Sequence, residues 1–173
     1  ILVLKQFLWI RKKMNKVIVT TSINPPTEAI KKFDDFNDWT LIVIGDKKTP
    51  KDYKLKNGIY ISPNEQIKLD KKLSDLIGWN CIERRNFGLI YANKIGATII
   101  ALVDDDNIPY KFWGKDILIG EKQLINEYTV KDGVFDPFIA TEYSNLWHRG
   151  FPLELIDTRI IKKISKKNIV ADV

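Results

Sequence analysis

Residues Thr98–Asn107 read Thr-Ile-Ile-Ala-Leu-Val-Asp-Asp-Asp-Asn, and this segment sets the architecture expected for the whole chain. The run 98–103 is apolar or β-branched without alternation, which is typical of a strand buried on both faces in the middle of a parallel sheet. It stops at Asp104, Asp105 and Asp106, whose adjacent carboxylates repel one another and are costly to bury unpaired. We therefore expect them at the carboxyl end of the strand, in the crevice where open α/β sheets bind ligands.

A hard divalent cation would relieve the repulsion within this acidic cluster. Mg²⁺ and Mn²⁺ prefer oxygen ligands and often join one or two carboxylates to substrate phosphates. We therefore predict a metal–nucleotide site at residues 104–106. The competing interpretation is an ordinary turn, because Asp and Asn side chains accept backbone hydrogen bonds in turns.

The rest of the sequence predicts an α/β fold, a mostly parallel sheet with helices on both faces. The expected strands are Lys16–Ile23, Trp39–Ile44, Ile59–Ile61 and Thr98–Val103, with further short strands at 117–119 and 128–130. The expected helices are Thr27–Phe36, a broken helical stretch over Pro63–Trp79, and Arg84–Gly96, where Gly96 is the stop signal.

Composition is that of a soluble globular domain of 173 residues, with 45% hydrophobic and 29% charged residues. Cys81 is the only cysteine, so an intrachain disulfide is excluded. The net charge of +6 suits anionic small substrates, and no motif indicates nucleic-acid binding. We expect a single domain over 14–173, truncated at its C-terminus, and an N-terminal extension over 1–13.

That extension has two interpretations. The segment Ile1–Ile10 is largely apolar and is followed by Arg11-Lys12-Lys13, as in the last part of a membrane anchor with its cytoplasmic basic flank. It is too short to span a bilayer alone, so a spurious upstream extension or a fragment boundary is the alternative. We expect the protein in the cytoplasm or at the cytoplasmic face of a membrane.

Several separated motifs resemble one protein family. The block from Arg84-Arg85-Asn86-Phe87-Gly88 through Ala92 and Gly96 to Asp104-Asp105-Asp106 resembles the central block of GT-A-fold glycosyltransferases, in which an Arg-Asn-x-Gly helix start leads to a strand ending in Asp-x-Asp. The segments 19–27, 42–50 and 147–154 extend the likeness to STELLO-type glycosyltransferases, which are distantly similar to reversibly glycosylated polypeptides. The resemblance covers roughly Lys16–Leu155.

The resemblance implies a GT-A-like fold and transfer of a sugar from a nucleotide diphosphate sugar, with uridine diphosphate (UDP) as carrier, to an acceptor that the sequence does not name. It implies Mn²⁺ or Mg²⁺ held by Asp104 and Asp106, a cation that would stabilise the departing diphosphate. The nucleotide-binding residues would be Thr20, Thr21, Asp46, Arg85, Asn86, Asp104, Asp105 and Arg149.

The catalytic base is the least determined part of the expected site. Inverting GT-A enzymes use a carboxylate beyond the Asp-x-Asp motif to deprotonate the acceptor hydroxyl, which leaves Asp136, Glu142 and Glu154 as candidates. His148, the only histidine, is a candidate for metal binding or proton transfer, although a lone histidine more often has a structural role.

Two other functions compete with the transferase. A nucleotidyltransferase would carry a glycine-rich signature after the first strand, and residues 20–27 contain no glycine. A non-catalytic module that binds nucleotide sugars or regulates glycosylation enzymes would show affinity without turnover.

Overall fold

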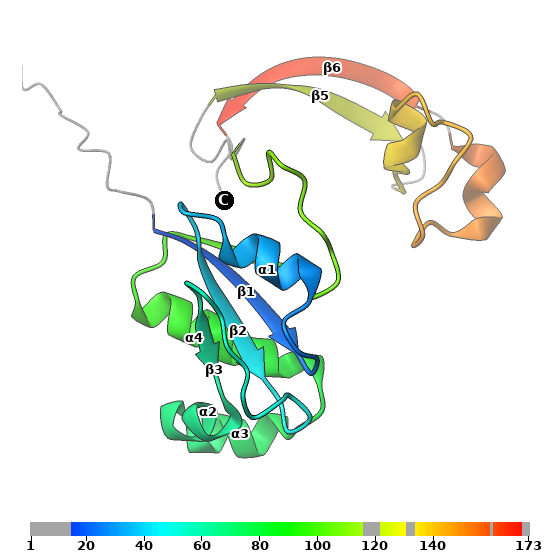
Figure 1. Ribbon diagram of the computed structural model, residues 1–173. Helices are drawn as coiled ribbons and strands as arrows, with labels where there is room; N and C mark the ends of the chain where they lie inside the picture. The colour runs from blue at the N-terminus through cyan, green and yellow to red at the C-terminus, as the bar shows by residue number, and fades with distance from the viewer. Residues whose placement is uncertain (1–14, 116–121, 131–133, 160, 171–173) are drawn as a thin grey trace, which may run out of the picture. The chain divides into compact units, whose positions relative to one another are not determined.

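The computed structural model describes residues 15–115, 122–130, 134–159 and 161–170, in two units divided between Trp113 and Gly114 (Figure 1). The predicted extension at 1–13 and the predicted strand at 117–119 lie outside the described residues. That 14–173 forms one domain stays a prediction.

The first unit is built on a four-stranded sheet in which every pair is parallel. Its strands are β1 (Lys16–Ser22), β2 (Thr40–Gly45), β3 (Ile59–Ile61) and β4 (Ile99–Leu102), in the order β3-β2-β1-β4. Parallel neighbours need crossover connections, and helices supply most of them here. The prediction of an α/β fold with a parallel sheet is confirmed, and the arrangement is consistent with a GT-A-like domain.

Local signals in the sequence set the helix boundaries. The helices are α1 (Glu28–Asp34), α2 (Pro63–Leu69), α3 (Lys71–Ile77) and α4 (Asn86–Lys94), with a 3₁₀ turn η1 (Ile82–Arg85) before α4. Asp70 produces the predicted break after α2, because its side chain accepts from the Leu73 N–H at 2.9 Å and so caps α3. Gly96, at φ +75°, follows α4 in the left-handed region that favours glycine.

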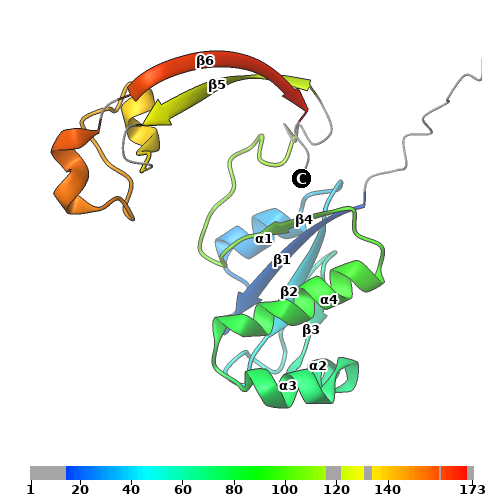
Figure 2. The ribbon, with the colours of Figure 1, turned by 180° about the vertical axis from the view of Figure 1, so that it is seen from behind.

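The helices cover opposite faces of the sheet. Figure 1 and the reverse view in Figure 2 show α1 over one face and α4 over the other. On the α4 face, Phe87 and Ala92 form a buried cluster with side chains of three strands, namely Val17, Val19, Ile42, Ile44 and Ile61. Leu69 and Leu73 of α2 and α3 pack against this cluster. Burial of these apolar groups is the main stabilisation of the unit.

The expectation that 98–103 forms a strand buried on both faces is wrong. β4 is an outermost strand of the described sheet, and Ile100 and Leu102 are 37% and 50% exposed. These two residues lie opposite Val17 and Val19 in the register, so they share the α4 face. They stay exposed because α4 packs over β1 and β2 instead, and most residues of those two central strands are buried.

The second unit contains a two-stranded antiparallel sheet. β5 (Lys122–Val130) pairs with β6 (Ile161–Val170), and the 3₁₀ helices η2 (Pro137–Ala140) and η3 (Leu153–Thr158) lie between them in sequence. The strand predicted at 128–130 is confirmed as the end of β5. Across the described part of the chain, no helix combines the length and apolarity needed to cross a membrane. Membrane association and a cytoplasmic location stay predictions.

Gly88 lets α4 approach the sheet closely, and replacing it should test this packing. A Cβ atom at position 88 would lie 2.2 Å from Cγ1 of Val19 and 3.2 Å from Cγ1 of Ile44. Overpacking of this kind costs about 1–3 kcal/mol, more than the ~1 kcal/mol that alanine gains over glycine in a helix. Gly88→Ala should therefore lower the free energy of unfolding measured by urea denaturation.

The matched control is Asn93→Ala, an exposed position on the same helix. It should leave the free energy of unfolding unchanged or slightly raised, since it gains helix propensity without a new contact. Equal stability of Gly88→Ala and wild type would contradict the packing described here.

Candidate functional site

The parallel register brings the carboxyl ends of three strands to one edge of the sheet. Ser22 at the end of β1 lies opposite Gly45 at the end of β2. On the other side of β1, Val103 continues the pairing beyond β4, because its N–H donates to the Val19 carbonyl at 3.2 Å. The segments that follow β1, β2 and β4 therefore meet at this edge, where ligand sites of open α/β sheets lie.

Asp105 joins the acidic cluster to the loop after β1. Its Oδ2 accepts from Oγ of Ser22 at 2.6 Å and from Nδ2 of Asn24 at 3.3 Å. Its carbonyl accepts from the hydroxyl of Thr27, the residue that also caps α1. Asp105 therefore holds the cluster against the end of β1, and both donors to its carboxylate are side-chain groups, not the backbone N–H groups of the turn interpretation.

Asp46 is held in the turn that follows β2. Asp46 is only 6% exposed. Its carboxylate accepts hydrogen bonds from the N–H of Lys47 at 2.6 Å and from the N–H of Asn80 at 2.8 Å. The Thr49 hydroxyl accepts from the Asp46 N–H at 2.7 Å and donates to the Ser22 carbonyl at 2.6 Å. The turn is thus tied to both the β1 end and the segment after α3.

A pocket of about 380 Å³ opens between these turns. It brings together three predicted nucleotide-binding residues, Thr21, Asp46 and Asp105. Its remaining lining residues were not predicted from the sequence: Ile23, Asn24, Lys48, Asn80, Cys81 and Ile82. Thr20 is fully buried and does not line the pocket.

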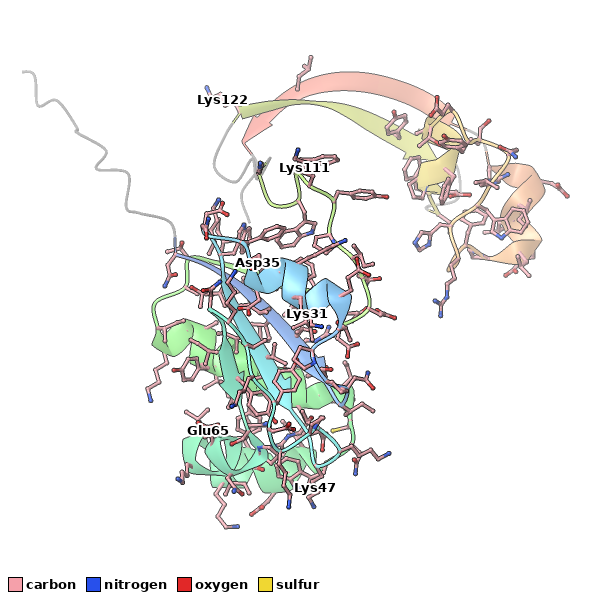
Figure 3. All side chains as sticks on the ribbon, viewed as in Figure 1. Lys31, Asp35, Lys47, Glu65, Lys111 and Lys122 are labelled. Atoms are coloured by element: carbon pink, nitrogen blue, oxygen red, sulfur yellow. The ribbon has the colours of Figure 1, made fainter. Side chains whose placement is uncertain are left out.

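Asn80 had a detectable signal in the sequence. It follows Gly78-Trp79, and Gly and Asn near each other mark turns with left-handed backbone. The structure places Gly78 at φ +74° and Asn80 at φ +58°. Lys47, labelled in Figure 3, lies near this turn, with its ammonium 5.2 Å from the centroid of the Trp79 ring.

Arg85 and Asp104 form an ion pair beside the pocket. Nη2 of Arg85 donates to Oδ1 of Asp104 at 2.7 Å and to the Val103 carbonyl at 3.3 Å, and Nδ2 of Asn107 lies 3.4 Å from Oδ2 of Asp104. Asn86, the first residue of α4, is exposed. Arg85, predicted to bind the nucleotide, therefore lies at the acidic cluster and is paired there with the Asp104 carboxylate.

The metal prediction rests on two exposed carboxylates, those of Asp104 and Asp106. Within the described ranges, no group of three or more His, Cys, Asp or Glu side chains is arranged to hold a metal ion. Mg²⁺ commonly takes only one or two protein carboxylates and completes its shell with water and substrate phosphates, so this donor set suits such an ion. The metal role of both residues stays a prediction.

Arg84, the first residue of the Arg-Arg-Asn motif, lies inside the protein. Its residue is 1% exposed, and its guanidinium carbon lies 3.6 Å from the Trp79 ring centroid and 4.6 Å from that of Phe87. Burial lowers the pKa of Arg84, while the nearby negative charge of Asp46 acts in the opposite direction. Stacking on two aromatic rings is what the sequence pattern could not reveal.

Asp136, a predicted catalytic residue, has a structural environment in the second unit. Its side chain is fully buried and paired with Nη1 of Arg159 at 2.8 Å. It also accepts from the N–H groups of Phe138 and His148, both at 3.1 Å. Burial by itself raises the pKa of Asp136. The hydrogen bonds from Arg159 and the two N–H groups lower it by more, so the pKa of Asp136 is below its usual value.

The other candidates of the second unit are exposed: Glu142, His148, Arg149 and Glu154. Nδ1 of His148 accepts from the Gly150 N–H at 3.2 Å. The roles predicted for these four residues stay predictions.

Comparison with known proteins gives the sequence a context. The chain is 29% identical over 153 residues to Probable glycosyltransferase STELLO2 of Arabidopsis thaliana, a match covering 82% of this chain and 20% of that protein. It is 29% identical over 149 residues to Probable glycosyltransferase STELLO1 of the same plant, covering 80% and 19%.

The STELLO-type resemblance is confirmed. This STELLO-like chain spans about a fifth of the length of the curated relatives it matches. No protein-family model matches it.

The environment of Asp136 predicts a pH-dependent effect of its replacement. Asp136→Asn should destabilise the second unit at pH 7, because it leaves Arg159 without its carboxylate partner. Since the folded-state pKa is lowered, the carboxylate stabilises above its unfolded pKa of about 3.9 and loses that contribution as the pH falls through the lower folded value. The difference from wild type should therefore shrink below about pH 4.

Hydrogen exchange at the Phe138 and His148 amides measures this effect locally. Asp157→Asn, an exposed acid of the same unit, serves as the control and should leave exchange unchanged. Unchanged protection in Asp136→Asn at pH 7 would refute the structural role.

Proposed function

We propose that this chain carries the donor-binding region of a metal-dependent glycosyltransferase that uses a UDP-sugar. The observation that carries the proposal is the meeting of Thr21, Asp46 and Asp105 around one pocket, with Asp104 and Asp106 next to it in the chain. The names of the STELLO relatives support a sugar-transfer activity. UDP as the carrier is what the family resemblance implies, and the oxygen ligands that Asp104 and Asp106 would offer support a divalent cation.

Asp46 is proposed to bind the nucleoside. Each of its carboxylate oxygens accepts one backbone N–H, and a carboxylate has about four acceptor sites. The remaining lone pairs can accept a base N–H or a ribose hydroxyl in the pocket. Thr21 and Asp105 would line the same nucleoside, whereas Thr20 would act only through packing, because it is fully buried.

The diphosphate is proposed to lie beside Asp104, Asp106 and Arg85. Asp104 and Asp106 would hold Mn²⁺ or Mg²⁺, which when bound neutralises the diphosphate and stabilises the departing nucleotide. Arg85 would exchange its ion pair with Asp104 for the phosphate, to which a guanidinium can make bidentate contacts. Asn86 at the start of α4 and Arg149 would be further phosphate or sugar contacts.

Glu142 is a better candidate for the catalytic base than Asp136. The Asp136 carboxylate already accepts from Arg159 and two backbone N–H groups, and its lowered pKa disfavours proton uptake at neutral pH. Glu142 is exposed. His148 and Glu154 stay alternatives for proton transfer.

A non-catalytic nucleotide-sugar-binding module is the second candidate. The ion pair of Asp136 with Arg159 favours the binding module, because it occupies one of the carboxylates predicted as the catalytic base. Release of UDP from a UDP-sugar separates the candidates, because a binding module would show affinity without turnover.

Isothermal titration calorimetry with UDP tests the proposal. Mn²⁺ should tighten UDP binding to the wild-type protein by about tenfold or more, which corresponds to ~1.4 kcal/mol. Asp106→Ala should abolish this enhancement, because it removes one of the two proposed carboxylate ligands. Asp75→Ala, which removes an exposed acid of α3, should bind like wild type. A UDP affinity that changes neither on addition of Mn²⁺ nor in Asp106→Ala would overturn the metal–nucleotide site.

A further inference from the structure

Arg84 is a buried cation without a carboxylate partner. It is 1% exposed, and none of the ion pairs within the described residues includes it. Removing a charge from water without an opposite charge is costly, and hydrophobic replacements of buried ionic groups are often neutral or stabilising. Its presence here therefore calls for a role beyond filling space.

The guanidinium of Arg84 binds acceptors from two separate elements. Nε donates to Oε1 of Gln66 in α2 at 2.9 Å. Nη1 donates to the Ser74 hydroxyl at 3.1 Å, to the Ser74 carbonyl at 3.3 Å and to the Gly78 carbonyl at 3.0 Å. The planar group also stacks on the Trp79 ring. Arg84 thereby fixes the end of α3 and the turn that leaves it.

Both routes from Arg84 lead to the Asp46 turn. Nε2 of Gln66 donates to the Gly45 carbonyl at 2.7 Å, immediately before Asp46. The turn fixed at Gly78 continues to Asn80, whose N–H donates to Oδ2 of Asp46. Thus the backbone before Asp46 and one of the two N–H donors to its carboxylate, that of Asn80, are both linked to the same guanidinium.

No other side chain type makes this set of contacts. Lysine carries a positive charge but has a single ammonium and no planar surface, so it cannot bind Gln66 and Gly78 while stacking on Trp79. Methionine would match the volume and lose every hydrogen bond, leaving buried acceptors unpaired. The geometry requires a fork, and arginine supplies it.

We propose that Arg84 is a positioning residue that presents the Asp46 carboxylate to the nucleoside, through Gln66 on one side and the 78–80 turn on the other. The inference rests on the proposed nucleotide function. Arg84 itself does not line the pocket, so its effect on a ligand must pass through Asp46 and its turn.

A double-mutant cycle on UDP affinity tests this proposal. Arg84→Lys should weaken binding about tenfold, as expected for misplacing one charged hydrogen-bonding group. Asp46→Asn should weaken binding by at least as much. The double variant should match Asp46→Asn within about twofold, because once the carboxylate is gone its positioning has no further effect on the ligand. Additive losses would overturn the proposal, since they would indicate general destabilisation.

Ser74→Ala repeats the cycle with a smaller change. It removes one hydroxyl acceptor of Arg84 and alters no charge, so it remains informative if Arg84→Lys does not fold. Its weaker effect on UDP affinity should likewise vanish in the Asp46→Asn background. Lys71→Ala is the control, because it breaks an exposed pair of α3 with Asp75 and leaves the Arg84 contacts intact.

The ligand-free protein gives a readout that is independent of UDP. Cys81, the only cysteine, follows Asn80 and lines the pocket. N-ethylmaleimide should modify Cys81 several-fold faster in Arg84→Lys than in wild type or Lys71→Ala, because the turn opens more often. Equal rates would overturn the positioning role. Faster modification in a protein that binds no UDP would support the positioning of the turn and refute the proposed function.

Discussion

The parallel register of β1 with β2 and β4 is the constraint on which the site depends. It places Ser22, Gly45 and the start of the acidic cluster at one edge of the sheet. Side chains then fix the arrangement, since Ser22 donates to Asp105 and Thr49 joins the β2 turn to the end of β1. A one-residue slip of any strand would move its side chains to the other face and take the site apart.

Charge is distributed around this edge in two ways. Asp104 is exposed and neutralised by Arg85, a pair that solvent screens and that a ligand can exchange at modest cost. Asp46 is buried and held by two backbone N–H groups. One of them belongs to Asn80, in the turn whose Gly78 carbonyl binds Arg84. The Asp104–Arg85 pair can therefore change partners when a ligand binds. The Asp46 carboxylate is already fixed in position, as recognition of a defined hydrogen-bond pattern requires.

The sequence allowed the fold to be predicted well because strand ends and helix caps are local signals. The family resemblance, rather than these local signals, named Thr21, Asp46 and Asp105 as nucleotide-binding residues, and the structure gathers them around one pocket. The exposure of Ile100 was missed, because an apolar run does not reveal which strands α4 covers. The burial of Arg84 was missed as well, since its partners are aromatic rings and carbonyls brought together only by tertiary folding.

A crystal structure of the protein with UDP and Mn²⁺ tests the central claim most directly. We expect the nucleoside in the pocket of Thr21, Asp46 and Asp105, with Asp46 accepting a hydrogen bond from the base or the ribose. The ion should contact Asp106 and a phosphate oxygen, and Arg85 should have left Asp104 for the diphosphate. Nucleotide bound elsewhere, or an ion with no contact to Asp104 or Asp106, would contradict the assignment of this edge as the donor site.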